Sequence, residues 1–208
     1  MDPRPRPFAL VRSFVLADFI TLANAACGTG AIFFCLNYLE AGHHAPFLVG
    51  AFTLLPLALV FDVADGMVAR RRHHASPFGG DLDSLADVVS FGVAPAVLGF
   101  TLGLRGVWDA LVLCGFVCCG VSRLARFNVT AEALSGGTGK VKYFEGTPIP
   151  TSVLLVAVLA VAAWQGRIGD ELWGGAWRLG PATLHPLTML FALSGTLMIS
   201  KTLRIPKL

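Results

Sequence analysis

Long apolar stretches constrain the fold of this chain more than any other feature. A helix needs about 20 mostly apolar residues to cross the hydrocarbon core of a bilayer. Six stretches of the 208-residue chain approach or reach that length, and they lie near 18–39, 46–66, 85–104, 107–125, 150–166 and 184–202. The sequence therefore predicts an all-α integral membrane protein with six transmembrane helices.

The composition supports a surface in contact with lipid. Hydrophobic residues make up 55% of the chain and charged residues only 14%, whereas a soluble domain has about 25% charged residues. The formal net charge of +3 gives no indication of nucleic-acid binding. The length suits one domain, and we expect residues 1–14 to form an N-terminal cytoplasmic, interfacial segment and residues 15–208 to form a six-helix membrane domain.

Lysine and arginine residues predict the orientation. Six spans place both termini and the loops after the second and fourth spans on one side, and thirteen of the 16 Lys and Arg residues fall there. The positive-inside rule makes that side cytoplasmic. The short chain and minimal tails favour a bacterial inner (cytoplasmic) membrane.

Two prolines bear on the third span. Ser76-Pro77 is typical of an N-cap followed by proline in the first helical turn, so we expect this helix to begin near Pro77, before its apolar part. Pro95 lies inside the span, where it removes one backbone hydrogen bond and predicts a kink.

Acidic residues recur at helical spacing around the loop between the second and third spans. Asp62 and Asp65 are three residues apart, and Gly79, Asp83 and Asp87 follow one another at intervals of four. On helices, each set shares a face. Because a short loop joins the two helices, we expect them to pack as antiparallel neighbours, with both acidic faces meeting at the cytoplasmic edge of the membrane.

Four carboxylates gathered at a membrane indicate a metal site. Intramembrane acids are costly and usually functional, and divalent cations would remove their mutual repulsion. Hard oxygen ligands suit Mg²⁺ or Mn²⁺. Two such ions would balance four carboxylates and accept a further anionic ligand such as a pyrophosphate. The alternative is a pair of ordinary helices whose acidic side chains are solvated. We interpret a further acid, Asp81, as a surface charge, because it is two residues from Asp83 and therefore points away from that helix face.

The whole pattern resembles a family signature. The spacing D-x-x-D-G-x-x-A-R-x8-G-x3-D-x3-D, typical of the CDP-alcohol phosphotransferase family, is complete at Asp62, Asp65, Gly66, Ala69, Arg70, Gly79, Asp83 and Asp87. The resemblance implies a six-helix homodimer with a cytosolic site in which the four aspartates hold two Mg²⁺ or Mn²⁺ ions. It also implies that Gly66, Ala69, Arg70 and Gly79 line a CDP pocket and that Asp87 is the catalytic base.

Further segments resemble one branch of this family. Residues 17–24, 84–95, 123–128 and 143–150 are similar to membrane-embedded phosphatidylserine synthases, and residues 139–148 are similar to the fungal branch. The resemblance covers roughly residues 15–155. It implies CDP-diacylglycerol as the donor, L-serine as the acceptor, and phosphatidylserine and CMP as products.

A serine substrate would need a cationic partner for its carboxylate. Arg123 and Arg126 lie on one face of the fourth span and would hold it bidentately; alternatively, they are topology anchors. Phe127 would shape the pocket and Asn128 would orient the amine.

Lys142 and Tyr143 precede a Gly-Thr-Pro turn. They would contact the lipid phosphate or close over serine, and the alternative is an ordinary surface loop.

Two other functions remain open at this point. One is the same chemistry with glycerol 3-phosphate, inositol phosphate or choline as the acceptor. The other, more remote, is a divalent-cation transporter, in which the glycines and the arginine of the signature have no role.

Overall fold

The computed structural model describes residues 14–72, 78–135, 143–200 and 204–206, and for residues 69–72, 130–135, 143–145 and 204–206 it describes the backbone alone. The described part is mostly helical. Its main helices are α2 (Leu16–Glu40), α3 (Ala45–Arg72), α4 (Gly79–Asp87), α5 (Ala94–Leu102), α6 (Val107–Ser135), α7 (Val153–Trp164) and α8 (Met189–Ile199). Short 3-10 helices at Ile149–Ser152, Gly169–Glu171 and Pro186–Thr188 precede or follow them.

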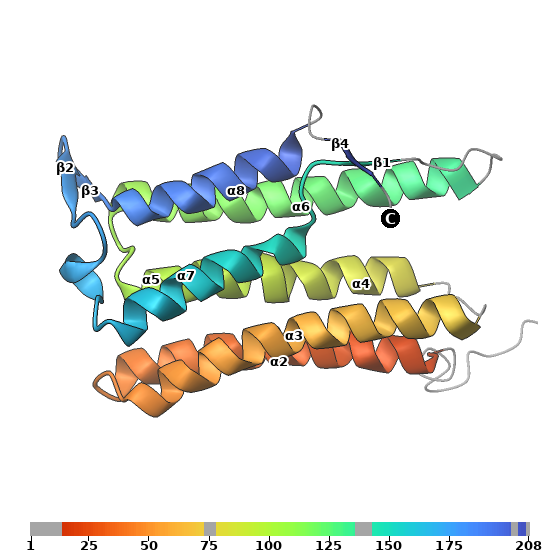
Figure 1. Ribbon diagram of the computed structural model, residues 1–208, viewed down its shortest axis with the longest axis horizontal. Helices are drawn as coiled ribbons and strands as arrows, with labels where there is room; N and C mark the ends of the chain where they lie inside the picture. Colours follow the sequence, from red (N-terminus) through yellow and green to blue (C-terminus); the bar gives the residue numbers. More distant parts are fainter. Residues whose placement is uncertain (1–13, 73–77, 136–142, 201–203, 207–208) are drawn as a thin grey trace, which may run out of the picture.

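Four helical segments are long and apolar enough to cross a membrane. They are Leu16–Glu40, Ala45–Val68, Gly79–Leu102 and Val107–Val129. The fifth and sixth predicted spans are shorter apolar helices, Ile149–Trp164 and Pro186–Ile199. Figure 1 shows that α7 and α8 end part-way along the bundle, while α2, α3, α4 and α6 continue beyond them. The protein is thus an integral membrane protein.

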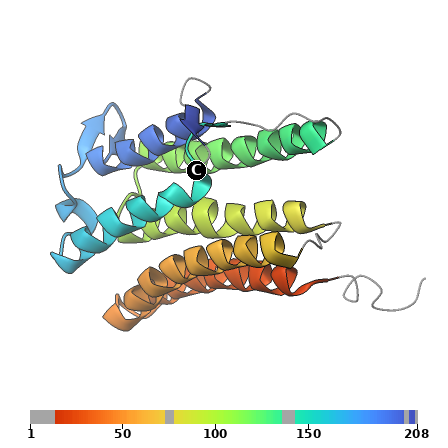
Figure 2. The same ribbon diagram turned by 45° about the vertical axis from the view of Figure 1, so that its right-hand side comes forward.

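Helix α2 is the element on which the site is assembled. It packs against α3 along most of its length and also against α4 and α5, whereas α3 and α4 contact each other less than either contacts α2. The acidic faces of the second and third spans do meet, at Asp62, Asp83 and Asp87, but α2 supplies most of the packing of both α3 and α4. Figure 2 shows α2 and α3 side by side, with α4 above them.

The third span is interrupted by a π-helical segment, η1 (Val88–Val93), between α4 and α5. At its end the Ala94 amide bonds to the Val89 carbonyl, one residue further back than in an α-helix. Pro95 follows in the first turn of α5, where a missing N–H is tolerated. The helix begins at Gly79 with Phe78 as its N-cap, and the predicted cap at Ser76-Pro77 lies outside the described residues.

Close helix packing fixes α2 against this π-helical segment. A side-chain carbon added to Gly28 would lie 2.7 Å from the Cα of Ser90, so only glycine fits there. The Ser90 hydroxyl donates a hydrogen bond to the carbonyl oxygen of Asn24, 2.9 Å away. The backbone of Asn24 is therefore held in place beside η1.

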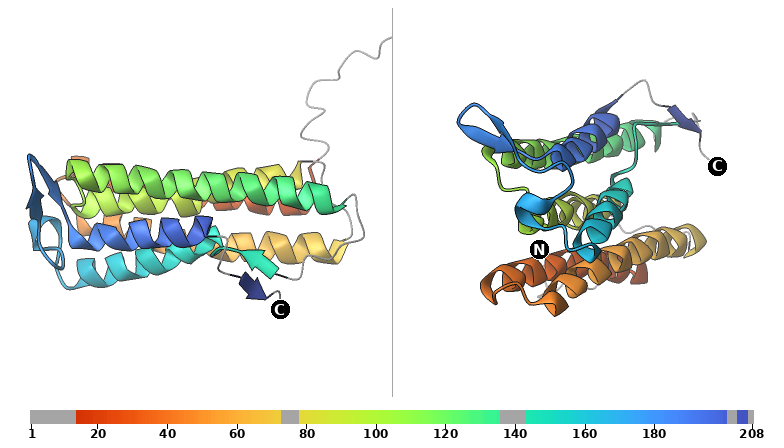
Figure 3. Two further views of the ribbon diagram at one scale, coloured as in Figure 1. Left: turned by 90° about the horizontal axis from the view of Figure 1, so that it is seen from above. Right: turned by 60° about the vertical axis from the view of Figure 1, so that its left-hand side comes forward.

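Two small antiparallel sheets lie outside the bundle. Strand β1 (Tyr143–Glu145) pairs with β4 (Arg204–Pro206), and β2 (Trp177–Leu179) pairs with β3 (Ala182–Leu184). The β2–β3 hairpin closes one end of the molecule, and the β1–β4 pair lies beside the helices beyond the end of α8 (Figure 3). The first pair joins the segment after the fourth span to the C-terminal region.

Candidate active site and metal centre

Three of the four predicted ligands converge in space. Asp62 on α3 and Asp83 and Asp87 on α4 place one carboxylate oxygen each within 4.8 Å of one another. Asp87 is 6% exposed, and Asp62 and Asp83 are half-buried. Three carboxylates on two helices give the hard oxygen donors that Mg²⁺ and Mn²⁺ prefer.

One buried oxygen of the cluster suits a bound cation. Oδ1 of Asp83 is buried and has no hydrogen-bond partner among the described residues. An unpaired buried acceptor is unfavourable, and a cation bound by the cluster would supply the partner. The donor set therefore fits a divalent metal.

The fourth predicted ligand, Asp65, has a separate environment. It is 5% exposed and does not belong to the converging group. Its Oδ2 accepts a hydrogen bond from the hydroxyl of Thr21 on α2, at 2.6 Å. It remains close enough to interact electrostatically with Asp62, Asp83 and Asp87. The four acids thus divide into a converging set of three and one neighbour held by α2.

Helix α2 contributes a polar face that the sequence reasoning missed. Asn24 is completely buried, and its side-chain amide donates to Oδ1 of Asp87 at 3.3 Å, while its own Oδ1 has no partner among the described residues. Asp18, Thr21 and Asn24 are spaced by three residues and so share a face. Polar residues at helical spacing in an apolar stretch were the available signal, because such residues usually have a function in membranes.

The predicted CDP-binding residues lie on the helices that carry the acids. Gly66 lies one residue after Asp65 on α3, and Gly79 is the first residue of α4. Ala69 and Arg70 belong to the last turns of α3, but their side chains lie outside the described residues. Their helical positions agree with the spacing of the signature, and their contacts stay a prediction.

Arg123 on α6 lies toward the acids. It is half-buried, and its Nε is buried with no hydrogen-bond partner among the described residues. Its guanidinium interacts electrostatically with Asp87. Arg126, one turn further along, donates from Nη2 to the carbonyl oxygen of Ile199 at the end of α8, at 3.4 Å. The two arginines therefore have different neighbours.

Asn128 joins α6 to α4. Its Oδ1 accepts a hydrogen bond from the Ser84 hydroxyl at 3.0 Å, and its Nδ2 donates to Asp81 at 3.3 Å. Asp81 is exposed, as expected from its position off the acidic face. Phe127 is 46% exposed.

The loop residues of the predicted serine pocket are only partly described. Lys142 lies outside the described residues. Tyr143 begins β1 and pairs with Pro206 of β4, while its side chain lies outside the described residues. The structure thus places the backbone after Lys142 beside the C-terminal strand.

Comparison with known proteins shows which family this chain belongs to. The model of the CDP-alcohol phosphatidyltransferase family matches residues 14–197. The chain belongs to this family. Divalent metals are generally used in this family, and the described part of this member contains a cluster of three aspartates that could hold such an ion.

Several curated members are similar to this one. The CDP-diacylglycerol–serine O-phosphatidyltransferase of Saccharomyces cerevisiae is 42% identical over 203 residues, which cover 96% of this chain and 73% of that protein. The protein of the same name from Methanocaldococcus jannaschii is 36% identical over 152 residues, covering 72% and 62%. An archaetidylserine synthase of Methanothermobacter thermautotrophicus is 36% identical over 162 residues, covering 76% and 63%. The chain therefore spans less than two thirds of both archaeal relatives.

Proposed function

We propose that this protein transfers the phosphatidyl group of CDP-diacylglycerol to L-serine, producing phosphatidylserine and CMP, in a reaction that requires a divalent metal. The observation that carries the proposal is the convergence of Asp62, Asp83 and Asp87 in a chain that the family model matches from residue 14 to residue 197. Relatives named for transfer to serine support the acceptor.

Asp62, Asp65, Asp83 and Asp87 would hold two Mg²⁺ or Mn²⁺ ions. When bound, the metal neutralises the diphosphate of the donor and the charge on the departing CMP. The chain's own contribution is to fix the carboxylates, which it does through the packing of α2 and through the hydrogen bond from Thr21 to Asp65. Gly66, Ala69, Arg70 and Gly79 would bind the CDP moiety beside them.

Asp87 would act as the general base. A serine hydroxyl is a weak nucleophile because it holds its proton tightly at neutral pH. As its oxygen bonds to the lipid-side phosphorus, Asp87 takes the proton and the bond from phosphorus to CMP breaks. Asn24 orients the carboxylate for this step through its bond to Oδ1. No covalent enzyme intermediate is required if both substrates occupy one site, as the proposal has it.

Arg123 would bind the serine carboxylate. Its Nε is buried with no hydrogen-bond partner among the described residues, and its guanidinium interacts electrostatically with Asp87, which supports a donor near the proposed base. A guanidinium pairs with a carboxylate bidentately. Arg126, Phe127, Asn128, Lys142 and Tyr143 complete the proposed pocket for serine and the lipid phosphate.

The proposal includes a membrane arrangement. CMP and serine are soluble in water while the acyl chains stay in the bilayer, so the reaction needs a site at the boundary. The excess of Lys and Arg on one side supports a site on the cytoplasmic side of the membrane, together with both termini. The two shorter apolar helices would complete six spans, and the protein would act as a homodimer. The bacterial inner membrane stays a prediction, since relatives from yeast and archaea do not distinguish it.

An acceptor panel tests the function. Purified protein in vesicles containing CDP-diacylglycerol and Mg²⁺ or Mn²⁺ is given labelled serine, glycerol 3-phosphate, inositol phosphate or choline. We expect serine alone to enter lipid, one CMP to be released for each serine, and EDTA to stop both. Transfer to another acceptor without transfer to serine would reassign the substrate. Metal flux that needs no CDP-lipid would instead support a transporter.

A further inference from the structure

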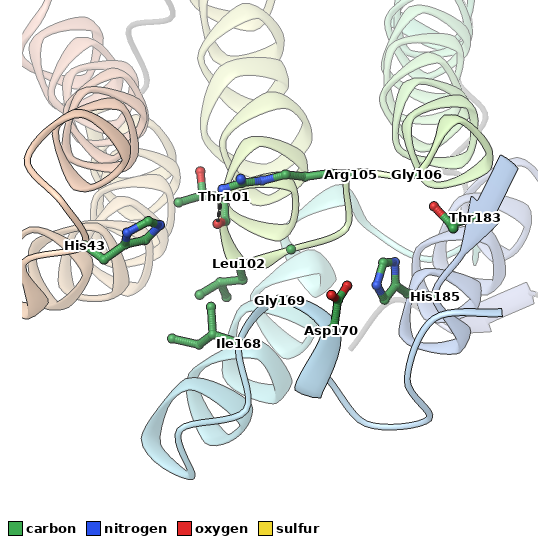
Figure 4. Close-up of a pocket in the computed structure, with 11 residues that line it drawn as sticks. His43, Thr101, Leu102, Arg105, Gly106, Ile168, Gly169, Asp170, Thr183 and His185 are labelled. Carbon is green, nitrogen blue, oxygen red and sulfur yellow. Dashed lines mark hydrogen bonds between the residues drawn. The ribbon is translucent and has the colours of Figure 1, made fainter. Parts of the chain in front are cut away.

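A polar pocket lies at the end of the bundle opposite the acidic cluster. Its volume is about 370 Å³, within the range of small-ligand sites. The connections between helices form it, and its polar lining consists of His43, Thr101, Arg105, Asp170, Thr183 and His185. Thr101 lies in the last turn of the span Gly79–Leu102 and Arg105 follows it, whereas Asp83 and Asp87 lie near its start, so most of that span separates the pocket from the acids. Figure 4 shows the pocket.

One wall of the pocket is fixed by a buried carboxylate. Asp109, completely buried at the start of α6, accepts hydrogen bonds from the Gly106 amide, the His185 amide and the Thr188 hydroxyl, at 2.6–2.9 Å. Its Oδ2 also lies 2.6 Å from Nδ1 of His185. Because a carboxylate only accepts, Nδ1 carries the proton of this bond.

His185 also lines this side of the pocket. It is 4% exposed, and its Nε2 is buried without a hydrogen bond among the described residues. Figure 4 draws the Asp170 carboxylate on the same side of the pocket. A carboxylate only accepts hydrogen bonds, so this side of the pocket suits a ligand ammonium group, which has only donors. The His185 tautomer that carries its one proton at Nδ1 adds Nε2 as a second acceptor.

The opposite side of the pocket presents a cation. The Arg105 guanidinium is held in place by bonds from Nε to the Phe100 carbonyl and from Nη2 to the Thr101 carbonyl, both 3.1 Å. These two bonds use two of its five N–H donors. A fixed guanidinium with donors to spare suits a phosphate group. Figure 4 shows His43 on the same side, across from Asp170 and His185.

The ligand that matches both sides is a zwitterion with a phosphate and an amine. The pocket lies where the spanning helices end, which is the depth of lipid headgroups. A metal is a poorer match, because Asp62, Asp83 and Asp87 form the converging ligand group found in the described part of the chain, and the pocket residues are not in it. We propose that this pocket binds the phosphoethanolamine headgroup of a phospholipid in the leaflet opposite the acidic cluster.

Competition between headgroups tests this. The detergent-solubilised full chain is mixed with equal amounts of ethanolamine, glycerol and serine phospholipids that carry identical acyl chains, and bound lipid is counted by native mass spectrometry. We expect the ethanolamine lipid to dominate, because the glycerol headgroup lacks an amine and the serine headgroup adds a carboxylate that Asp170 repels. Water-soluble glycerophosphoethanolamine should displace it, which separates headgroup recognition from acyl-chain binding.

Matched variants locate the site. Asp170→Asn should weaken ethanolamine-lipid binding by about tenfold, whereas Glu171→Gln, the exposed neighbour outside the pocket, should leave it unchanged. Arg105→Gln should also weaken ethanolamine-lipid binding, and Arg167→Gln is its control. If loss of the Arg105 hydrogen bonds unfolds the chain, the comparison of Asp170→Asn with Glu171→Gln still decides the test. Equal binding of all three lipids, equal effects of Asp170→Asn and Glu171→Gln, or binding of Zn²⁺ in place of lipid would overturn the proposal. The readout is binding, so a failure of the proposed serine transfer does not affect it.

Discussion

The side-chain amide of Asn24 on α2 donates a hydrogen bond to Oδ1 of Asp87 on α4, 3.3 Å away. The bond links a helix without any signature residue to the acid that we propose as the base. Asn24 is itself fixed by the Ser90 hydroxyl and by the close approach of α2 to η1 at Gly28. The orientation of Asp87 therefore depends on helix packing in the middle of the bundle.

Asn24→Ala should lower kcat through the orientation of Asp87. Loss of a residue that orients a metal-binding or catalytic group typically costs about 10–100-fold in activity or metal affinity. Thr29→Ala on the same helix is the control, because Thr29 is exposed and bonds only to its own helix at Ala25. Steady-state kinetics with serine and CDP-diacylglycerol checks this, and equal activity of both variants would remove Asn24 from the site.

Asp87→Asn should abolish turnover while the protein still folds and binds CDP-lipid. A general base contributes about 10²–10⁴-fold to the rate, and an amide cannot accept the serine proton. Glu171→Gln should keep nearly full activity, because Glu171 is exposed and is not a member of the cluster. Single-turnover transfer of labelled serine, together with CDP-lipid binding, is the measurement. Near-normal turnover in Asp87→Asn would exclude Asp87 as the base.

Arg123→Gln should raise the KM for serine by at least about tenfold with little change in the KM for CDP-diacylglycerol, because its guanidinium, with a buried Nε, interacts electrostatically with Asp87, the proposed base. Arg126→Ala should have the same selectivity and a smaller effect, since one of its donors is bonded to Ile199. Kinetics at saturating CDP-diacylglycerol, and then at saturating serine, separate the two constants. Equal increases for both substrates would move the arginine concerned out of the serine pocket.

The sequence predicted the acids but not what orients them. The spacing of Asp62, Asp83 and Asp87 is set by helical geometry, so their convergence in the structure was predictable once both segments were taken as helices. The hydrogen bonds that Thr21 and Asn24 donate to the acids were not predictable, because they depend on the packing of α2 beside both acidic helices. No local sequence pattern specifies that packing. The π-helical segment was also not predicted in detail: Pro95 predicted a kink, but no local pattern indicated the extra backbone residue at Val88–Val93, where α2 approaches closely.

The ends of the fold were less predictable than its centre. The four long spans have strong apolar patterns and lie where the sequence placed them. The pairing of Tyr143–Glu145 with Arg204–Pro206 joins strands of three residues that are far apart in the chain. Such short strands have no detectable periodicity of their own, so only the folded chain brings them together.

Asp109→Asn should destabilise the protein without touching the acidic cluster. Asp109 accepts hydrogen bonds from Gly106, His185 and Thr188. In the asparagine variant, the NH₂ group would replace one of the two accepting oxygens and would face groups that are themselves donors. Disrupting one member of a buried pair typically costs about 3–5 kcal/mol. Thermal unfolding in detergent checks this, with the exposed Glu171→Gln as the control. If both variants unfold at the wild-type temperature, the Asp109 network does not hold α6 and the segment before α8 together.

Asp62 and Asp65 should differ in metal binding, although the signature treats them alike. Asp62 belongs to the converging group and Asp65 is bonded to Thr21. Manganese titration followed by electron paramagnetic resonance should therefore show loss of the tighter ion in Asp62→Asn and loss of only the weaker ion in Asp65→Asn. Thr21→Val should strengthen the weaker site, because it releases Oδ2 of Asp65, and Asp81→Asn should match the wild type. Identical titrations for Asp62→Asn and Asp65→Asn would mean that all four acids act as one set once the metal is bound.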